Sequence, residues 1–504
     1  MSGEVETGLG GTGLGSTGLR RDAIGLREVL FQSITAMAPA AAVAASIPSG
    51  AAFAGGSLPL AVLIALVACL FTASCVAELA RELPAAGSVA TYAAQGLHPA
   101  VGFLVGWGYV FVEALVPPLL LLQLGFTSAG TLHQEWSSYP ADLWWPWALA
   151  GAAVIAAAGY FGVRASARFG TVLGVFEILV FLVFALWLIG RAGSHNTLSV
   201  FGTSHTAGGY EGISGVFAGS VYTVLAFAGF EAAAPLAEET RDPRRTMHRA
   251  VLGAALAIGL FYVVTTYAMT VYFGPDRFAR FGASGDASWE GVARASFGLF
   301  WVLVFLAVVN STIANANACA NVSTRTAFAL ARIRVLPGLF ATLHPKYRSP
   351  VPGIAVQTLV AVGAVLGLGL GYDPVTAFLL LATVIVTVVI GVYIVVNLAC
   401  MGYFLRRRRE LLKPVRHLLL PVLGTVAFVP ALLTAAGLPV FDFVTELTAP
   451  VSYAGPIVGI WMVAGLVVLL VLMRRHPERI AETARVHLDE PALTGPSQNG
   501  AAHP

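Results

Sequence analysis

The stretch from Gly219 to Arg249, GSVYTVLAFAGFEAAAPLAEETRDPRRTMHR, decides how this chain folds. It begins as an apolar segment and is interrupted by small residues around Gly229. It then places a carboxylate, Glu231, where a membrane span would be surrounded by hydrocarbon. An acid at the centre of a bilayer costs about 2.5–3.5 kcal/mol on insertion scales. A segment that served only as an anchor would not keep this acid, so the stretch predicts a membrane span that belongs to a pathway.

The composition agrees with a membrane location. The chain has 504 residues, of which 57% are hydrophobic and 11% charged, with a mean hydropathy of +0.79. Soluble domains carry about 25% charged residues, so this composition predicts a polytopic membrane protein. The four cysteines, Cys69, Cys75, Cys319 and Cys400, lie in apolar runs without the spacing of a metal site. We interpret them as small buried side chains, and we expect neither a metal nor a cofactor.

Twelve apolar segments can be distinguished, each near the 20 residues that a bilayer requires. Their approximate limits are 29–54, 57–80, 99–126, 144–162, 169–190, 214–237, 248–273, 296–322, 352–371, 375–402, 417–436 and 451–473. With this division, all but four of the 29 Lys and Arg residues fall on one side of the membrane. The positive-inside rule therefore places both termini in the cytoplasm. We expect the protein to lie in the plasma membrane. Residues 1–24 and 476–504 are polar, and we expect them to be disordered tails.

Two of these segments contain features that interrupt a helix. In the first segment, Pro39 removes a backbone donor and disfavours helical geometry at Ala38. The sixth segment has its weak point at Gly229. Interruptions at corresponding places in two halves of a chain indicate an inverted-repeat transporter with its site at the midplane. The free backbone groups of a broken helix are tolerated in lipid only where they line a cavity. The alternative is that Pro39 merely kinks a packed helix.

Four motifs follow one another in order between about residues 25 and 410. They occupy residues 78–92 (ELARELPAAGSVATY), 102–107 (GFLVGW), 227–245 (FAGFE, then EE and DPRR) and 325–350 (an Arg, Leu-Pro and His-Pro pattern). Together they resemble the amino acid–polyamine–organocation (APC) superfamily of permeases. The resemblance implies an all-α polytopic membrane protein of twelve transmembrane helices with the LeuT-type fold. Five-plus-five inverted repeats at about 29–190 and 214–402 would form a core within 25–410, and two further spans would lie within 411–475.

The resemblance implies a substrate site at the two interruptions. The residues concerned are Ala36, Met37, Ala38 and Pro39 in the first segment and Leu225, Phe227, Ala228 and Gly229 in the sixth. In the family, glycine-rich amides at the first break usually hold a substrate carboxylate, whereas Ala-Met-Ala-Pro is closer to the polyamine-importing members. This departure weakens the expectation of α-carboxylate recognition. Leu225 replaces an aromatic lid residue, which weakens the case for an arginine or aromatic substrate.

Four acids lie in or near the predicted spans. Glu177 falls where many family members have a lysine in place of the sodium of sodium-driven relatives. Because apolar surroundings disfavour the charged form of a carboxyl group, we expect Glu177 to couple transport to protons. Its alternative role is a structural hydrogen bond. Glu231 is the candidate gate or proton-sensing acid, or else a cap on freed amides. Glu113 is a candidate partner for a substrate ammonium. We expect Glu78 to have an interfacial role at the cytoplasmic end of its span, either pairing with Arg81 or capping.

The eighth segment carries a polar stripe of Asn310, Asn317, Asn321 and Thr324, which share one face of a helix. This stripe is either the wall of a water-lined pathway, which we favour, or a contact between helices. A sodium site would use hydroxyls of the same segment, such as those of Ser311 and Thr312, but Glu177 favours protons.

These observations favour a secondary active transporter of an amino acid, a polyamine or a related small amine, coupled to protons and working by alternating access. An exchanger of the same substrates is the alternative, followed by a membrane-bound enzyme or a sensor. Enzymatic activity is not expected, because no histidine lies in the middle of a span to act as a base. No P-loop string for ATP is present. The Arg406–Arg409 cluster predicts contact with anionic lipid and not with nucleic acid.

Overall fold

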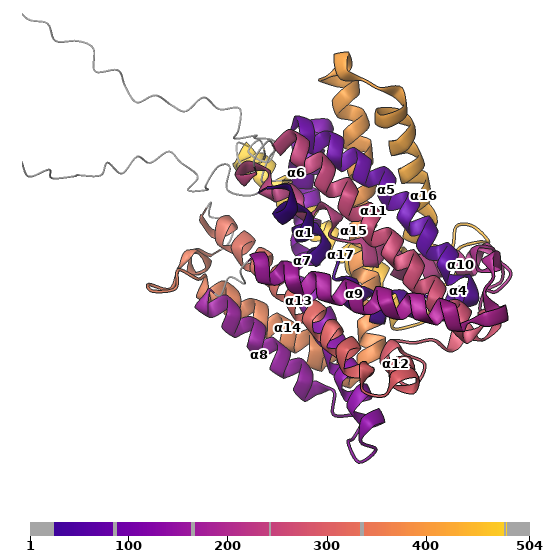
Figure 1. The fold of residues 1–504 in the computed structure, drawn as a ribbon. Helices are drawn as coiled ribbons and strands as arrows, with labels where there is room; N and C mark the ends of the chain where they lie inside the picture. The colour runs from indigo at the N-terminus through magenta and orange to yellow at the C-terminus, as the bar shows by residue number, and fades with distance from the viewer. Residues whose placement is uncertain are drawn as a thin grey trace, which may run out of the picture.

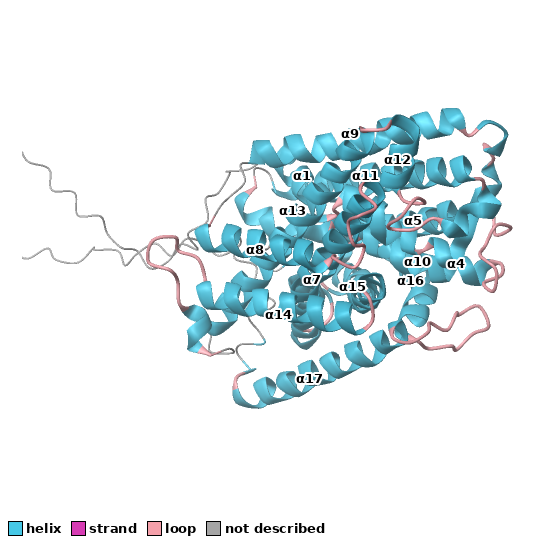
Figure 2. Ribbon diagram, turned by 90° about the horizontal axis from the view of Figure 1, so that it is seen from below, coloured by secondary structure: helices cyan, strands magenta, loops and turns pink. Residues whose placement is uncertain are grey.

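The computed structural model describes residues 25–83, 88–162, 167–240, 243–332, 337–477 and 480. Within these residues the chain consists of helices and loops, without a β-strand (Figure 2). Eleven helical segments of this part are long and apolar enough to cross a membrane, and a further apolar helix, Trp145–Phe161, is shorter. The all-helical class is therefore confirmed, and all twelve predicted segments coincide with helices. Both predicted tails, apart from residues 476, 477 and 480, lie outside the described residues.

The helices of the first half are α1 (Leu26–Ala36), α2 (Pro39–Ala41), α3 (Ile47–Ser49), α4 (Ala51–Ala54), α5 (Leu58–Glu82), α6 (Ser88–Gly96), α7 (Pro99–Glu135), α8 (Trp145–Phe161) and α9 (Ala167–Arg191). Those of the second half are α10 (Ile213–Phe227), the 3₁₀ helix η5 (Phe230–Glu239), α11 (Pro243–Phe273), α12 (Trp289–Phe297), α13 (Phe300–Arg332), α14 (Val351–Gly371) and α15 (Pro374–Arg406). They are followed by the π-helical turn η9 (Val415–Leu419), α16 (Leu420–Ala436) and α17 (Ala454–Arg475).

The helices pack in two groups that draw equally on both halves of the chain (Figure 1). One group contains α1, α5, α10 and α11, and the other contains α7, α8, α13 and α14. Helix α9 contacts members of both groups, and α15 packs against both α5 and α7. Spans one, two, six and seven thus form one group and spans three, four, eight and nine another, and α13 joins the two groups through its contacts with α1 and α2. An inverted repeat would produce this pairing, although the repeat boundaries stay a prediction.

Helix α17 lies at the edge of the molecule (Figure 2) and packs against α7. A pair of tryptophans joins the two helices. The indole of Trp107 donates to the carbonyl of Trp461 at 3.0 Å, and the indole of Trp461 donates to the carbonyl of Trp107 at 3.1 Å. Their rings stack with centroids 4.8 Å apart. Each indole N–H therefore has an acceptor, as aromatic packing within a membrane requires.

The structure contains both predicted helix interruptions. Helix α1 ends at Ala36, and Ala38 has left-handed backbone angles, φ 45° and ψ 64°, before the helix resumes at Pro39. Proline is well placed as the first residue of a helix, because its missing N–H would have no partner there. The chain is thus fully interrupted, and Pro39 does more than kink a helix. In the sixth span α10 ends at Phe227, and Gly229 has a φ of 111° before a 3₁₀ helix begins.

Candidate functional site

The two interruptions touch each other in the middle of the molecule. A Cβ atom on Gly229 would lie 2.7 Å from the carbonyl oxygen of Ala36. The hydroxyl of Ser33 donates to the carbonyl of Phe230 at 2.7 Å. The side-chain amide of Asn315, on α13, donates to the Ala36 carbonyl at 3.1 Å. Backbone groups released by one break are therefore bound partly by the other break and partly by α13.

A single buried tyrosine of α11 hydrogen-bonds a backbone carbonyl at each of the two interruptions. The hydroxyl of Tyr262 lies 3.0 Å from the carbonyl oxygen of Met37 and 3.0 Å from that of Ala226. Both carbonyls lie where a helix ends, so neither is matched by a helical N–H donor. Because one hydroxyl carries one proton, the two carbonyls share it. Tyr262 thereby fixes the distance between the two breaks.

Replacing Tyr262 with phenylalanine should lower the thermal stability of the purified protein clearly. The change leaves two buried carbonyls without their shared donor, and a buried unsatisfied polar group costs about 1–3 kcal/mol. Tyr267→Phe is the matched control, since it lies on the same helix and its hydroxyl bonds the exposed side chain of Asn196. Equal melting temperatures for the two variants, measured in detergent, would contradict this role of Tyr262.

A cavity of about 460 Å³ lies where the interruptions meet. Of the predicted substrate-site residues, the cavity is lined by Ala36, Met37, Ala38, Leu225, Ala228, Gly229 and Glu113. Tyr109, Gln123 and Asn315 add polar groups, and Glu231 adds a second carboxyl group. The lining reaches Gln32, Ser88 and Thr326, at the end of the molecule where α1 begins and α13 ends.

On the opposite side of the breaks, the helices are packed closely. A Cβ atom on Gly219 would lie 2.8 Å from Cβ of Ala54, and one on Gly50 would lie 2.9 Å from the carbonyl oxygen of Gly219. The hydroxyl of Ser46 also donates to the carbonyl of Tyr222 at 2.8 Å. Backbone-to-backbone contact of this kind needs glycine. The first and sixth spans thus lie against each other on this side of the cavity.

Both carboxyl oxygens of Glu231 accept hydrogen bonds from the protein. Tyr109 of α7 donates to its Oε1 at 2.6 Å, and Tyr393 of α15 donates to its Oε2 at 2.9 Å. The backbone N–H of Gly229 donates to Oε2 at 3.2 Å. The capping contact foreseen as the alternative role is therefore present. The gating role of Glu231 stays a prediction.

Glu113 differs from Glu231 in its surroundings. It projects from α7 into the cavity lining, and its buried Oε2 has no hydrogen-bond partner among the described residues. Cys319 and Asn315, which hydrogen-bond each other at 3.3 Å, also line the cavity. No lysine, arginine or histidine is among the described residues that line it. The cavity thus offers carboxyl, hydroxyl and amide groups and no fixed positive charge.

The family follows from comparison with known proteins. A family model described as "Amino acid permease" matches residues 28–478. The chain belongs to this family. The resemblance based on the four motifs is therefore confirmed.

Two relatives of this permease illustrate the range of its family. It is 27% identical over 379 residues to the low-affinity putrescine importer PlaP of Escherichia coli, an alignment that covers 74% of this chain and 79% of PlaP. It is 25% identical over 448 residues to the branched-chain amino acid permease BcaP of Bacillus subtilis, covering 85% and 88% of the two chains. Both relatives are transporters, so the family is one of transporters and not of enzymes.

A solved structure supports the fold. A mutant of the manganese transporter of Eremococcus coleocola superimposes with a TM-score of 0.52 at 12% identity, over 91% of this chain and 94% of that one. Identity this low shows the fold alone. The LeuT-type fold implied by the motifs is thereby confirmed for the permease.

Three predicted site residues do not line the cavity of the permease. Pro39 is buried, and Phe227 packs edge-on against Tyr262 with ring centroids 5.3 Å apart. Glu177, on α9, is 3% exposed and lies beside Asn310 and Ser311 of α13. Its Oε2 has no hydrogen-bond partner among the described residues. Glu177 therefore belongs to a separate polar contact between α9 and α13, and its role in coupling stays a prediction.

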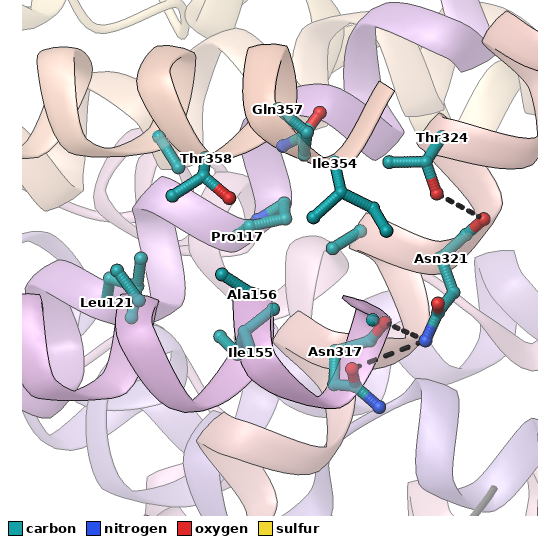
Figure 3. A pocket seen from close by; sticks show the side chains of 14 residues that line it. Pro117, Leu121, Ile155, Ala156, Asn317, Asn321, Thr324, Ile354, Gln357 and Thr358 are labelled. Atoms are coloured by element: carbon teal, nitrogen blue, oxygen red, sulfur yellow. Dashed lines mark hydrogen bonds between the residues drawn. The ribbon is translucent and has the colours of Figure 1, made fainter. Parts of the chain in front are cut away.

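The predicted polar stripe is divided between two places. Asn310 faces Glu177, whereas Asn317, Asn321 and Thr324 line a space of about 20 Å³ between α7, α8, α13 and α14 (Figure 3). Asn321 donates to the carbonyl of Asn317 at 2.9 Å. A space of this size holds about one water molecule. This part of the stripe lies apart from the cavity at the breaks, so a contact between helices describes it better than the wall of that cavity.

Sequence reasoning missed Tyr109, Tyr262 and Asn315. A signal existed for Tyr109, because it lies four residues before Glu113 and so on the same face of α7. Asn315 lies on a different face of α13 from the predicted stripe, and Tyr262 lies in an apolar run without any motif. Nothing in the sequence indicated that these two side chains meet the breaks.

Proposed function

We propose that this permease is a proton-coupled secondary transporter of a small organic amine, either a polyamine or an amino acid, and that it works by alternating access. The observation that carries the proposal is the cavity at the two helix breaks. It contains two carboxyl groups, Glu113 and Glu231, and no basic side chain among the described residues that line it. Such a lining favours a ligand with a positive charge.

The backbone N–H groups at the breaks already have acceptors, which favours a ligand that has no carboxylate. The N–H groups of Met37 and Ala38 donate to the carbonyls of Ser33 and Thr35, each at 3.1 Å. The N–H of Gly229 donates to Glu231, and Pro39 has no N–H. A substrate carboxylate would have to displace these bonds. The name of PlaP, a putrescine importer, agrees with a polyamine.

In the proposed cycle, Glu113 binds the substrate ammonium, because its Oε2 is the carboxyl oxygen of the cavity without a partner among the described residues. Glu231 acts as the gate, with Tyr109 and Tyr393 holding it between α7 and α15. Glu177 exchanges the coupling proton at the α9–α13 contact. Ala36, Met37, Ala38, Leu225, Ala228 and Gly229 shape the cavity, supported by Pro39 and Phe227.

We also propose that the protein resides in the plasma membrane with both termini in the cytoplasm. The distribution of Lys and Arg supports this orientation. The cavity lining reaches the end at which α1 begins, which would be the cytoplasmic end. This conformation would then face inward.

Uptake into proteoliposomes tests this function. We expect saturable accumulation of radiolabelled putrescine or of a branched-chain amino acid when the outside is acidic, and we expect a protonophore to abolish it. Unsaturable flux would favour a channel, and binding without flux a sensor. Accumulation that persists with the protonophore, or that needs sodium, would contradict proton coupling.

Replacing Glu113 with glutamine should weaken putrescine binding by about tenfold to a hundredfold, because a hydrogen bond to a charged group is worth about 1.5–3 kcal/mol. Glu135→Gln is the matched control, since Glu135 pairs with Arg294 at the far end of the same helix. Ligand-induced stabilisation of the purified protein, titrated with putrescine, measures the affinity. Unchanged affinity in Glu113→Gln would remove this carboxylate from the substrate site.

A further inference from the structure

Two consecutive prolines lie inside helix α7, one turn beyond the cavity carboxyl group of Glu113. They are Pro117 and Pro118. In an α-helix each backbone N–H donates to the carbonyl four residues earlier, and proline has no N–H to donate. The carbonyls of Glu113 and Ala114 therefore have no donor within the helix. The turn of α7 that carries Glu113 thus lacks two of the hydrogen bonds that fix a helical backbone.

A glutamine of α14 supplies one of the two missing donors. Gln357 is 8% exposed, and its side-chain Nε2 donates to the carbonyl of Ala114 at 3.1 Å. Its Oε1 accepts the hydroxyl of Ser323, on α13, at 2.8 Å. Gln357 and Pro117 both line the small space between α7, α8, α13 and α14 (Figure 3). Because the Ser323 hydroxyl binds Oε1, the amide nitrogen of Gln357 faces the carbonyl that Pro118 leaves without a donor.

One face of α13 contacts both Gln357 and the carboxyl group of Glu113. Cys319 lies four residues before Ser323, so the two side chains are one turn apart on the same face. The thiol of Cys319 lies beside the Glu113 carboxyl group. The contacts therefore form a closed ring through three helices. Its members, in order, are Glu113, Cys319, Ser323, Gln357 and Ala114, which is the chain neighbour of Glu113.

This ring attaches the Glu113 carboxyl group to one of the two helix groups. Its three helices, α7, α13 and α14, all belong to the group that also contains α8. The two breaks, which form the facing part of the cavity wall, belong to α1 and α10 of the other group. Gln357 does not itself line the cavity. Any effect of Gln357 on a bound substrate must therefore pass through α7 or α13.

We propose that Gln357 is a positioning residue for substrate binding: it holds the proline-interrupted turn of α7 so that the Glu113 carboxyl group points at the substrate ammonium. This inference rests on the proposed function, in which Glu113 binds that ammonium. An unpaired carbonyl is costly inside a membrane, so without Gln357 the turn shifts until Ala114 finds another donor. The Glu113 side chain moves with the turn, because the two residues are adjacent in the chain.

Gln357→Met tests the proposal, because methionine keeps the length of the side chain and removes both polar atoms. We expect the affinity for putrescine, measured by ligand-induced stabilisation of the purified protein, to fall about tenfold, which corresponds to about 1.4 kcal/mol. In a Glu113→Gln background the same change should lower the affinity by less than about twofold, because the carboxyl group that Gln357 positions is already absent. Ser349→Ala is the matched control and should bind normally, since the Ser349 hydroxyl also donates to a backbone carbonyl, but to that of Tyr160 on α8, at 2.8 Å.

The outcomes separate this proposal from the proposed function. Wild-type affinity in Gln357→Met would overturn the proposal alone, and so would an equal loss in both backgrounds, which would mean that Gln357 only packs the helices. Wild-type affinity in Glu113→Gln would contradict the proposed role of Glu113, and with it this inference. If Gln357→Met does not fold, Ser323→Ala decides. It frees the Gln357 amide to rotate away from Ala114, so an unchanged affinity for putrescine would overturn the proposal.

Discussion

Replacing Glu177 with glutamine should abolish the accumulation of substrate against its gradient and leave counterflow exchange intact. Glutamine keeps the size of the side chain and can still hydrogen-bond the neighbouring Asn310 and Ser311. Glutamine has no titratable proton. A cycle that depends on protonation at this position therefore cannot accumulate substrate against its gradient. Substrate binding should persist because Glu177 does not line the cavity. Uptake driven by a pH gradient, measured beside counterflow at equal pH, separates the two effects.

The control for this variant changes another buried carboxyl group, one that lies outside the membrane spans. Glu290, in α12, is 2% exposed, and burial raises its pKa to about 7. Glu290→Gln therefore removes a buried carboxyl group whose pKa is raised, at a place that the proposed cycle does not use. It should pump at the wild-type rate. Wild-type pumping by Glu177→Gln would remove Glu177 from the mechanism.

Features that act locally were predictable from the sequence. Pro39 and Gly229 each determine the backbone at their own position, and both interruptions are present where they were expected. The class of the fold followed from hydropathy and from motifs in a fixed order. The ends of some helices were not predictable in the same way. Helix α7 continues to Glu135 and α13 to Arg332, beyond the apolar limits at 126 and 322, because hydropathy marks where apolar residues end and not where the helix ends.

Contacts between distant parts of the chain were not predictable. Tyr262 bonds Met37 across 225 positions, Asn315 bonds Ala36 across 279, and Arg416 bonds Glu78 across 338. One sequence carries no signal for such pairs. The breaks predicted where the cavity lies, but not every residue that lines it. Consecutive residues at a break point in different directions, so a whole stretch cannot line one cavity, and Pro39 and Phe227 turn away from it.

Replacing Gly229 with leucine should abolish putrescine binding while the protein still inserts into the membrane. A φ of 111° is a backbone conformation that residues with a side chain rarely adopt, and a Cβ atom there would lie 2.7 Å from the carbonyl oxygen of Ala36. Backbone strain of about 1–3 kcal/mol and overpacking of about 1–3 kcal/mol would both act at the contact between the two breaks. The breaks must move apart, and the hydrogen bonds of Ser33 and Tyr262 that hold them are lost with the shape of the cavity. Gly363→Leu on α14 is the control, because a side chain there meets nothing within 4 Å among the described residues. Ligand-induced stabilisation with putrescine measures binding in both variants, and a normal response from Gly229→Leu would show that the substrate binds somewhere other than between the first and sixth spans.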